Sequence, residues 1–97
     1  MVEGNYIAKG KVMGSEMESH IEYLVEGATL TGKMVVMGNT VDVEKGNVDG
    51  DSFTHLCHVP TPMGKMKVKV AGSINGDDIS FILQSPMAKS EFVGKRI

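Results

Sequence analysis

The chain has 97 residues, of which 41% are hydrophobic, and a formal net charge of −2 at pH 7. This length suits a single domain, predicted over residues 1–97, and the apolar content is too high for a disordered chain. The near-neutral charge argues against a nucleic-acid-binding protein, and no apolar run approaches the roughly 20 residues of a membrane helix.

The first residues and the cysteine content indicate a compartment. Met1–Gly4 lacks the basic and apolar regions of a signal peptide. Cys57 is the only cysteine, so it cannot form an internal disulfide. Both features favour a reducing, cytoplasmic location, and we expect neither a membrane nor a nucleic acid as a partner.

Eight segments alternate apolar and polar residues with the two-residue period of a β-strand. In the second segment, Met17, Ile21 and Tyr23 share one face, and Glu18 and Glu22 share the other. Twelve Gly and only three Pro, among many Val, Ile and Thr, also favour strands and tight turns. The predicted strands, in chain order, are 5–12, 16–25, 29–36, 40–48, 52–59, 65–73, 78–85 and 90–96.

Two alternating sets of turn signals separate these strands. The first set is a methionine beside a small residue, which recurs at intervals of 24 to 26 residues at Met13, Met37, Met63 and Met87. The second set falls between them, at Glu26-Gly27, Asp49-Gly50 and Asn75-Gly76. Asp-Gly and Asn-Gly favour type I′ hairpins, because both central residues of that turn need a positive φ. Successive strands are therefore predicted to be antiparallel.

Eight sequential hairpin strands predict an all-β fold. Closure into a small up-and-down antiparallel barrel removes the exposed strand edges, and a two-sheet β-sandwich is the alternative that the same pattern permits. The interior of an eight-stranded barrel is either filled by side chains or holds one small ligand. Because turns alternate between the two ends of a meander, the four methionine turns are predicted to share one mouth.

The two ends of the chain carry motifs of a known barrel family. Gly4-Asn5-Tyr6 opens the first predicted strand, and Gly94-Lys95-Arg96 ends the last. They resemble the Gly-x-Trp motif and the late Arg of lipocalin-like (calycin) barrels, of which this chain looks like a miniature. The chain departs from that family in having Tyr6 in place of Trp, a much shorter length and no C-terminal helix.

The repeated turns resemble a second group of proteins. The Pro-Met-Gly and Gly-x-Val-Asp-Gly-Asp rhythm is similar to that of small, uncharacterised bacterial β-barrel domains, over nearly the whole chain. This resemblance implies the fold and no chemistry. The likeness to lipocalin-like barrels implies that Tyr6 and Arg96 are structural, stacked as a cation–π pair.

One segment, Thr54 to His58, contains three residues of metal-ligating types. On a strand, His55 and Cys57 point to one face and His58 to the other. The three reach one ion only if a bulge intervenes, which the nearby Pro60 allows. We favour the interpretation that Cys57 is buried in the core and that the imidazole is hydrogen-bonded. We therefore expect no metal and no other cofactor.

Other polar groups have structural interpretations. His20 lies between Glu18 and Glu22, where a solvated charged face explains the pattern better than an acid/base pair. The turn carboxylates resemble a Ca²⁺ site, but Asx turns explain them; they are Asp49, Asp51, Asp77 and Asp78. The sequence contains no Ser-His-Asp arrangement, phosphate-binding Gly loop or CxxC pair, so we do not predict an enzyme.

The methionines are the main functional signal, because eight in 97 residues is a high content and flexible thioethers suit adaptable apolar contacts. The leading hypothesis is a non-enzymatic binding module that takes a small apolar or aromatic ligand at the methionine-lined mouth. The residues predicted to bind it are Met13, Met37, Met63 and Met87, with Tyr23, Phe53, Phe81 and Phe92 lining or closing the interior. The structural alternative is that the methionines only fill one end of a small hydrophobic core.

Two further hypotheses use the same residues differently. In one, the methionine rim is a structural contact, either a homodimer interface or a dock for a partner enzyme. In the other, His55, Cys57 and His58, with Met63 or Met66, bind a soft metal such as Cu or Zn.

Overall fold

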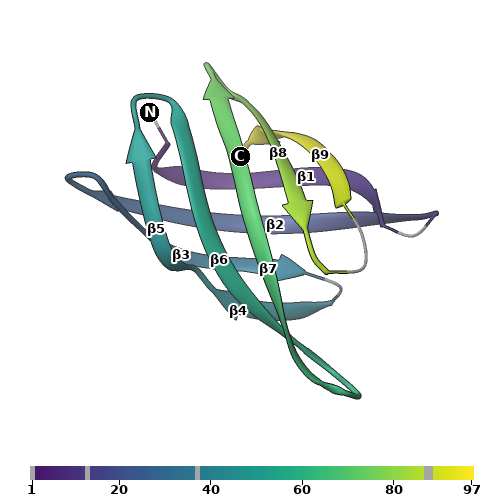
Figure 1. The fold of residues 1–97 in the computed structure, drawn as a ribbon. Helices are drawn as coiled ribbons and strands as arrows, with labels where there is room; N and C mark the ends of the chain where they lie inside the picture. The colour runs from purple at the N-terminus through teal and green to yellow at the C-terminus, as the bar shows by residue number, and fades with distance from the viewer. Residues whose placement is uncertain (1, 13, 37, 87–88) are drawn as a thin grey trace.

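The computed structural model describes residues 2–12, 14–36, 38–86 and 89–97, and Figure 1 shows the fold. These residues form strands joined by tight turns. The strands are β1 (Gly4–Val12), β2 (Ser15–Glu26), β3 (Thr29–Val36), β4 (Asn39–Asp42), β5 (Glu44–Asp49), β6 (Ser52–Thr61), β7 (Gly64–Asn75), β8 (Asp78–Gln84) and β9 (Lys89–Arg96).

Eight of these strands close into an antiparallel barrel. Around the ring the order is β2-β1-β9-β8-β7-β6-β5-β3, and pairing between β2 and β3 closes it, while β4 extends from β3 outside the ring. The barrel is flattened, with extents of 36 × 24 × 18 Å, and β6 and β7 cross in front of β1, β2 and β3 (Figure 1). The predicted up-and-down barrel is confirmed, because the strand pairing leaves no division into two separate sheets.

The predicted strand 40–48 differs from the observed one, because a bulge divides it into β4 and β5. Val41 pairs with Met34 and Gly46 pairs with Leu30, so this strand has one residue more than β3 between the two pairs. Lys45 takes up the bend with a φ of 49°. The Val43 backbone N–H still donates to the Gly32 carbonyl over 2.9 Å, so the connection to β3 continues across the bulge.

Alternate residues of every barrel strand point inward, as the two-residue period predicts. The largest side chains with almost no exposure are aromatic, aliphatic and one imidazole. They include Tyr6, Tyr23, Phe53, Phe81, Leu30, Met34, Ile79 and His55.

Glycines at inward positions make room for the largest rings. Gly72 pairs across the ladder with Phe81, and Gly10 pairs with Phe92. A Cβ at Gly72 would lie 2.5 Å from the Phe81 Cβ, and one at Gly10 would lie 2.7 Å from the Phe92 Cγ. The two phenyl rings stack with centroids 5.2 Å apart and an interplanar angle of 6°. The rings therefore occupy space that the glycines leave empty.

The C-terminal strand closes the glycine-turn end of the barrel through Arg96. Its guanidinium carbon lies 4.9 Å from the Tyr6 ring centroid, and its Nη1 donates to the Glu3 carbonyl over 2.6 Å. Its Nε lies 3.4 Å from the Asp77 carboxylate, and the Tyr6 hydroxyl donates to the Val2 carbonyl over 2.6 Å. Burial raises the Tyr6 pKa, and the Arg96 cation opposes that rise. This contact ties the two ends of the chain together.

A two-stranded ribbon covers part of the opposite end. β6 pairs with β5 as far as Leu56, and β7 pairs with β8 only from Lys69. Among the described residues, 57–61 and 64–68 therefore have ladder partners only in each other; we call them the β6–β7 ribbon. Its inward side chains are buried or half-buried and close the core: Cys57, Val59, Met66 and Val68. Figure 1 shows the tip extending past the neighbouring strands.

Candidate functional site

A buried polar group lies in the barrel interior, where β2 faces β6. The Tyr23 hydroxyl lies 2.7 Å from His55 Nε2, and His55 Nδ1 lies 3.3 Å from the Leu56 carbonyl. Because a carbonyl only accepts, Nδ1 carries the proton and Nε2 accepts from Tyr23. Burial lowers the pKa of His55 to about 4, although the Leu56 carbonyl partly opposes this change. The imidazole is therefore neutral at pH 7.

Cys57 follows two residues later on the same face, and it is fully buried. Burial raises its pKa to about 11, and the charge of Glu44 adds to that rise. Burial also raises the pKa of Tyr23 well above its ordinary value. Cys57 and Tyr23 are therefore protonated at neutral pH, and Tyr23 and His55 form a hydrogen-bonded pair in the core.

The aromatic residues predicted to line a ligand cavity are packed against one another. Tyr23 meets Phe53 with ring centroids 5.1 Å apart, and Phe81 stacks on Phe92. All four side chains are at most 2% exposed. A ligand inside this barrel would have to displace these contacts.

A small internal space remains near the methionine end. It measures about 10 Å³ and is lined by side chains that include Met17, Val36, Leu83 and Phe92. This volume is at the lower limit for one water molecule, and well below the 300 to 1,000 Å³ or so of ordinary ligand pockets.

The methionine turns are described at one position of four. Met63 lies at the tip of the β6–β7 ribbon with 98% of its surface exposed. Met13, Met37 and Met87 lie outside the described residues. Because all neighbouring strands are antiparallel, the strand ends that flank these four positions lie at one end of the barrel.

The three metal-ligating residues of β6 do not converge. His55 and Cys57 are buried inside, whereas His58 points outward and its Nδ1 lies 2.7 Å from the Glu44 carboxylate. The β6–β7 register continues without a shift from Ser52 to Thr61, so no bulge turns His58 inward. Within the described ranges, no three His, Cys, Asp or Glu residues form a group that could hold a metal.

His20 and Glu18 form an exposed pair on β2. The His20 Nε2 lies 2.9 Å from the Glu18 carboxylate, and both side chains are about half exposed. His20 also lines an open surface hollow of about 320 Å³, and the exposure of the pair agrees with the interpretation of a solvated face.

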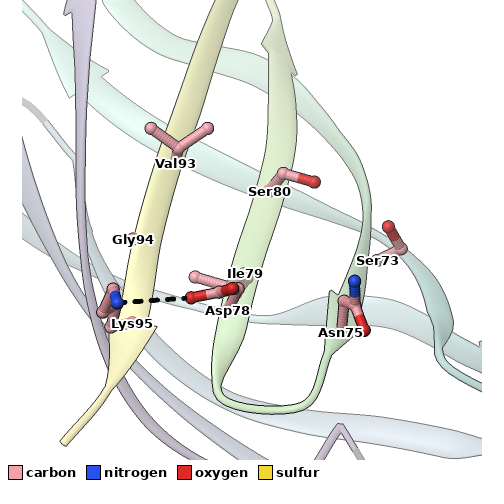
Figure 2. Close-up of a pocket in the computed structure, with 8 residues that line it drawn as sticks. All are labelled: Ser73, Asn75, Asp78, Ile79, Ser80, Val93, Gly94 and Lys95. Carbon is pink, nitrogen blue, oxygen red and sulfur yellow. Dashed lines mark ion pairs between the residues drawn. The ribbon is translucent and has the colours of Figure 1, made fainter.

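A shallow hollow of about 460 Å³ lies on the outer face of β7, β8 and β9 (Figure 2). The short side chains of Ser73 and Ser80 line it. Lys95 and Asp78 also line it, and the Lys95 Nζ lies 3.8 Å from the Asp78 carboxylate. Both charged side chains are mostly exposed, and the hollow is open to solvent. It lacks the enclosure of an ordinary ligand pocket.

Comparison with protein-family models, curated proteins and solved structures finds no match to this chain. Among the described residues, no helix has the length and apolarity needed to cross a membrane.

Sequence reasoning missed two features of these sites. Tyr23 and His55 are 32 residues apart, and only barrel closure places them within hydrogen-bonding distance. The strand pattern predicts that both point inward, but it does not say which inward residues of β2 and β6 meet. The β6–β7 ribbon also left no signal, because its residues alternate like those of the barrel wall.

Proposed function

We propose that this chain is a non-enzymatic interaction module that docks a partner protein at its methionine end. The observation that carries this proposal is a contrast. The interior is filled by the protein's own aromatic side chains, whereas Met63 stands almost fully exposed on a ribbon that extends past the barrel. Large exposed apolar side chains on projecting segments are common at contact surfaces.

The buried chemistry supports a binding role over a catalytic one. Four titratable groups of the interior are neutral at pH 7 and have almost no contact with solvent: Tyr6, Tyr23, His55 and Cys57. A catalytic group needs access to a substrate and a pKa near the working pH.

The proposal includes an ancestry and a location. We regard the chain as a shortened lipocalin-like barrel of bacterial type, supported by the closed strand order and by the contact between Tyr6 and Arg96. We also place it in the cytoplasm, because the free thiol of Cys57 suits a reducing compartment.

Site-specific photocrosslinking tests the proposal. A benzophenone amino acid replaces Met63 in one variant and Leu24 in another; both positions are exposed and apolar, and Leu24 lies on β2. Each variant is irradiated in an extract of the source organism. We expect one recurring protein adduct at position 63 and none at position 24. The captured protein, once purified, must also bind the unmodified domain.

The small-ligand hypothesis predicts a different result. An apolar probe that enters the barrel would raise the melting temperature by several degrees, since it binds only the folded state. No adduct at position 63, together with such a rise, would replace our proposal by a ligand-binding module. A homodimer would instead crosslink to itself, and sedimentation across a concentration series would show it.

A further inference from the structure

Charge is distributed unevenly along this chain. Residues 52–76, which cover β6 and β7, contain no Asp or Glu and three Lys. The rest of the chain contains all twelve acidic residues and the other seven basic ones. A protein with a net charge of −2 therefore has a local positive region against a negative remainder.

The three lysines form one row on the outer face of β7. Lys65, Lys67 and Lys69 are exposed and alternate with inward residues, so the Cα atoms of neighbouring lysines lie about 7 Å apart along the strand. Their partners across the ladder in β6 are Pro60, His58 and Leu56. Within the described part of the chain, none of the three forms an ion pair.

Glu44 interacts with one lysine of this row, and it already has a partner. Its pKa is lowered chiefly by a hydrogen bond from His58, with smaller effects from the charges of Lys65 and Lys45. The His58 Nδ1 lies 2.7 Å from its carboxylate. Of the three lysines in the row, Lys65 is the one whose charge lowers the Glu44 pKa.

Several lysines elsewhere on the barrel face carboxylates, although Lys89 pairs across the ladder with Gln84. On the outer face of β1 and β2, Lys11 pairs across the ladder with Glu16, and Lys9 pairs with Glu18. Near the other end, Lys95 lies 3.8 Å from Asp78. The row on β7 differs, because its cross-strand partners bring no negative charge.

We propose that the row binds an extended acidic segment of a partner protein, with carboxylates at every second residue. This inference rests on the proposed function as an interaction module and names its partner's chemistry. Alternate side chains of an extended peptide repeat about every 7 Å. Three carboxylates of such a segment can therefore meet Lys65, Lys67 and Lys69 in register.

The direction of the row argues against a flat anionic membrane. Lys69 lies about 14 Å along the strand from Lys65, counted at 3.4 Å or so per residue. A flat surface that contacts the ribbon tip end-on meets the exposed Met63 and Lys65 first, with Lys69 about 14 Å further along the strand. An extended segment lying along β7 reaches all three lysines.

Charge and size argue against a nucleic acid or a second copy. The radius of gyration is 12.3 Å, so a long polyanion on the row would pass within about one Debye length of the acidic remainder. The acidic row of a second copy, on β2, has a lysine opposite Glu16, Glu18 and Glu22 and is partly neutralised.

Fluorescence polarisation with labelled peptides tests this inference on the whole chain. One peptide alternates Glu and Thr over six residues, and the other has the same composition with three Glu followed by three Thr. At low ionic strength we expect the alternating peptide to bind at least threefold more tightly. Raising the salt concentration to 0.3 M should weaken the binding of the alternating peptide, because salt screens exposed charges.

Two matched variants locate the binding site. Lys67→Gln removes one charge from the row and should weaken binding about two- to fivefold, the range for one exposed ion pair. Lys33→Gln removes the same charge from the exposed face of β3 and should have little effect. Equal effects of the two variants, or equal binding of the two peptides, would refute the proposed row.

Other probes separate the competing partners. The inference would be overturned if the domain bound phosphatidylserine vesicles or a single-stranded oligonucleotide more tightly than the alternating peptide. It would also be overturned if the wild type self-associated and Lys67→Gln abolished that self-association. An adduct at position 63 without any peptide binding would leave the proposed function standing and reject only the acidic partner. Peptide binding without an adduct at position 63 would support the acidic partner and reject docking at the methionine end.

Discussion

Acid should destabilise this barrel through His55. The pKa of its imidazole is lowered to about 4 in the fold, against roughly 6.5 in an unfolded chain. Between these values the unfolded chain binds a proton that the folded one does not. Stability is therefore fully present above about pH 6.5 and is lost as the pH falls toward 4.

The size of this effect follows from the two pKa values. Proton linkage gives a loss of about 2 kcal/mol between pH 7.5 and pH 5, and about 3 kcal/mol by pH 4. The structural cause is clear, because Nε2 accepts the Tyr23 hydroxyl over 2.7 Å and the ring is 2% exposed. A second proton on the ring would take away the acceptor of the Tyr23 hydroxyl proton and leave a buried charge.

Urea unfolding followed by circular dichroism measures this loss. His55→Gln keeps an acceptor near Tyr23 and does not titrate, so carboxylates contribute to the wild type and the variant alike. The difference between the two proteins isolates the imidazole. We expect the wild type to lose about 2 kcal/mol more than the variant between pH 7.5 and pH 5.

NMR titration of the imidazole gives a second measurement that needs no variant. His55 should show no protonation above about pH 5. Tyr23→Phe removes the hydroxyl that favours the neutral ring, so it should raise the His55 pKa and reduce the pH dependence. It should also cost about 1–3 kcal/mol at pH 7, because a buried acceptor loses its partner. Protonation of wild-type His55 near pH 6.5 would refute this reasoning.

Three further predictions follow from the packing. Gly32→Ala should destabilise the fold by more than about 2 kcal/mol in urea unfolding, because φ is +136° and the new Cβ would lie 1.9 Å from the Glu22 carbonyl oxygen; an unchanged midpoint would contradict this. Phe81→Ala should cost about 3–5 kcal/mol, whereas the half-exposed control Ile82→Ala should cost less. Cys57 should react with a thiol reagent such as DTNB no faster than the protein unfolds, since the thiol is buried and its pKa is raised to about 11; rapid stoichiometric labelling of the native protein would oppose this.

The prediction of the fold succeeded where it depended on local pattern. The two-residue period placed His55 and Cys57 inward and His58 outward, and the structure agrees. Turn residues such as Gly50 and Gly76 marked strand ends, because these positions need the positive φ that glycine adopts readily. The bulge at Lys45 escaped prediction, since nothing in its immediate sequence demands an extra residue.

The candidate site was less predictable, because it depends on which residues meet across strands. Phe81 and Phe92 were expected to line an interior, but whether that interior is hollow depends on the facing glycines, Gly72 and Gly10. That pairing is a property of register in the closed barrel.

The sequence by itself therefore determined the strands other than the divided β4 and β5, most of the turns and the inward or outward face of the strand residues, because alternation and turn conformation act over a few neighbouring residues. Only the tertiary structure decided that the barrel is filled, that Tyr23 bonds to His55, and that residues 57–68 form a ribbon. These outcomes depend on contacts between strands far apart in the chain, whose distances are set only when the barrel closes.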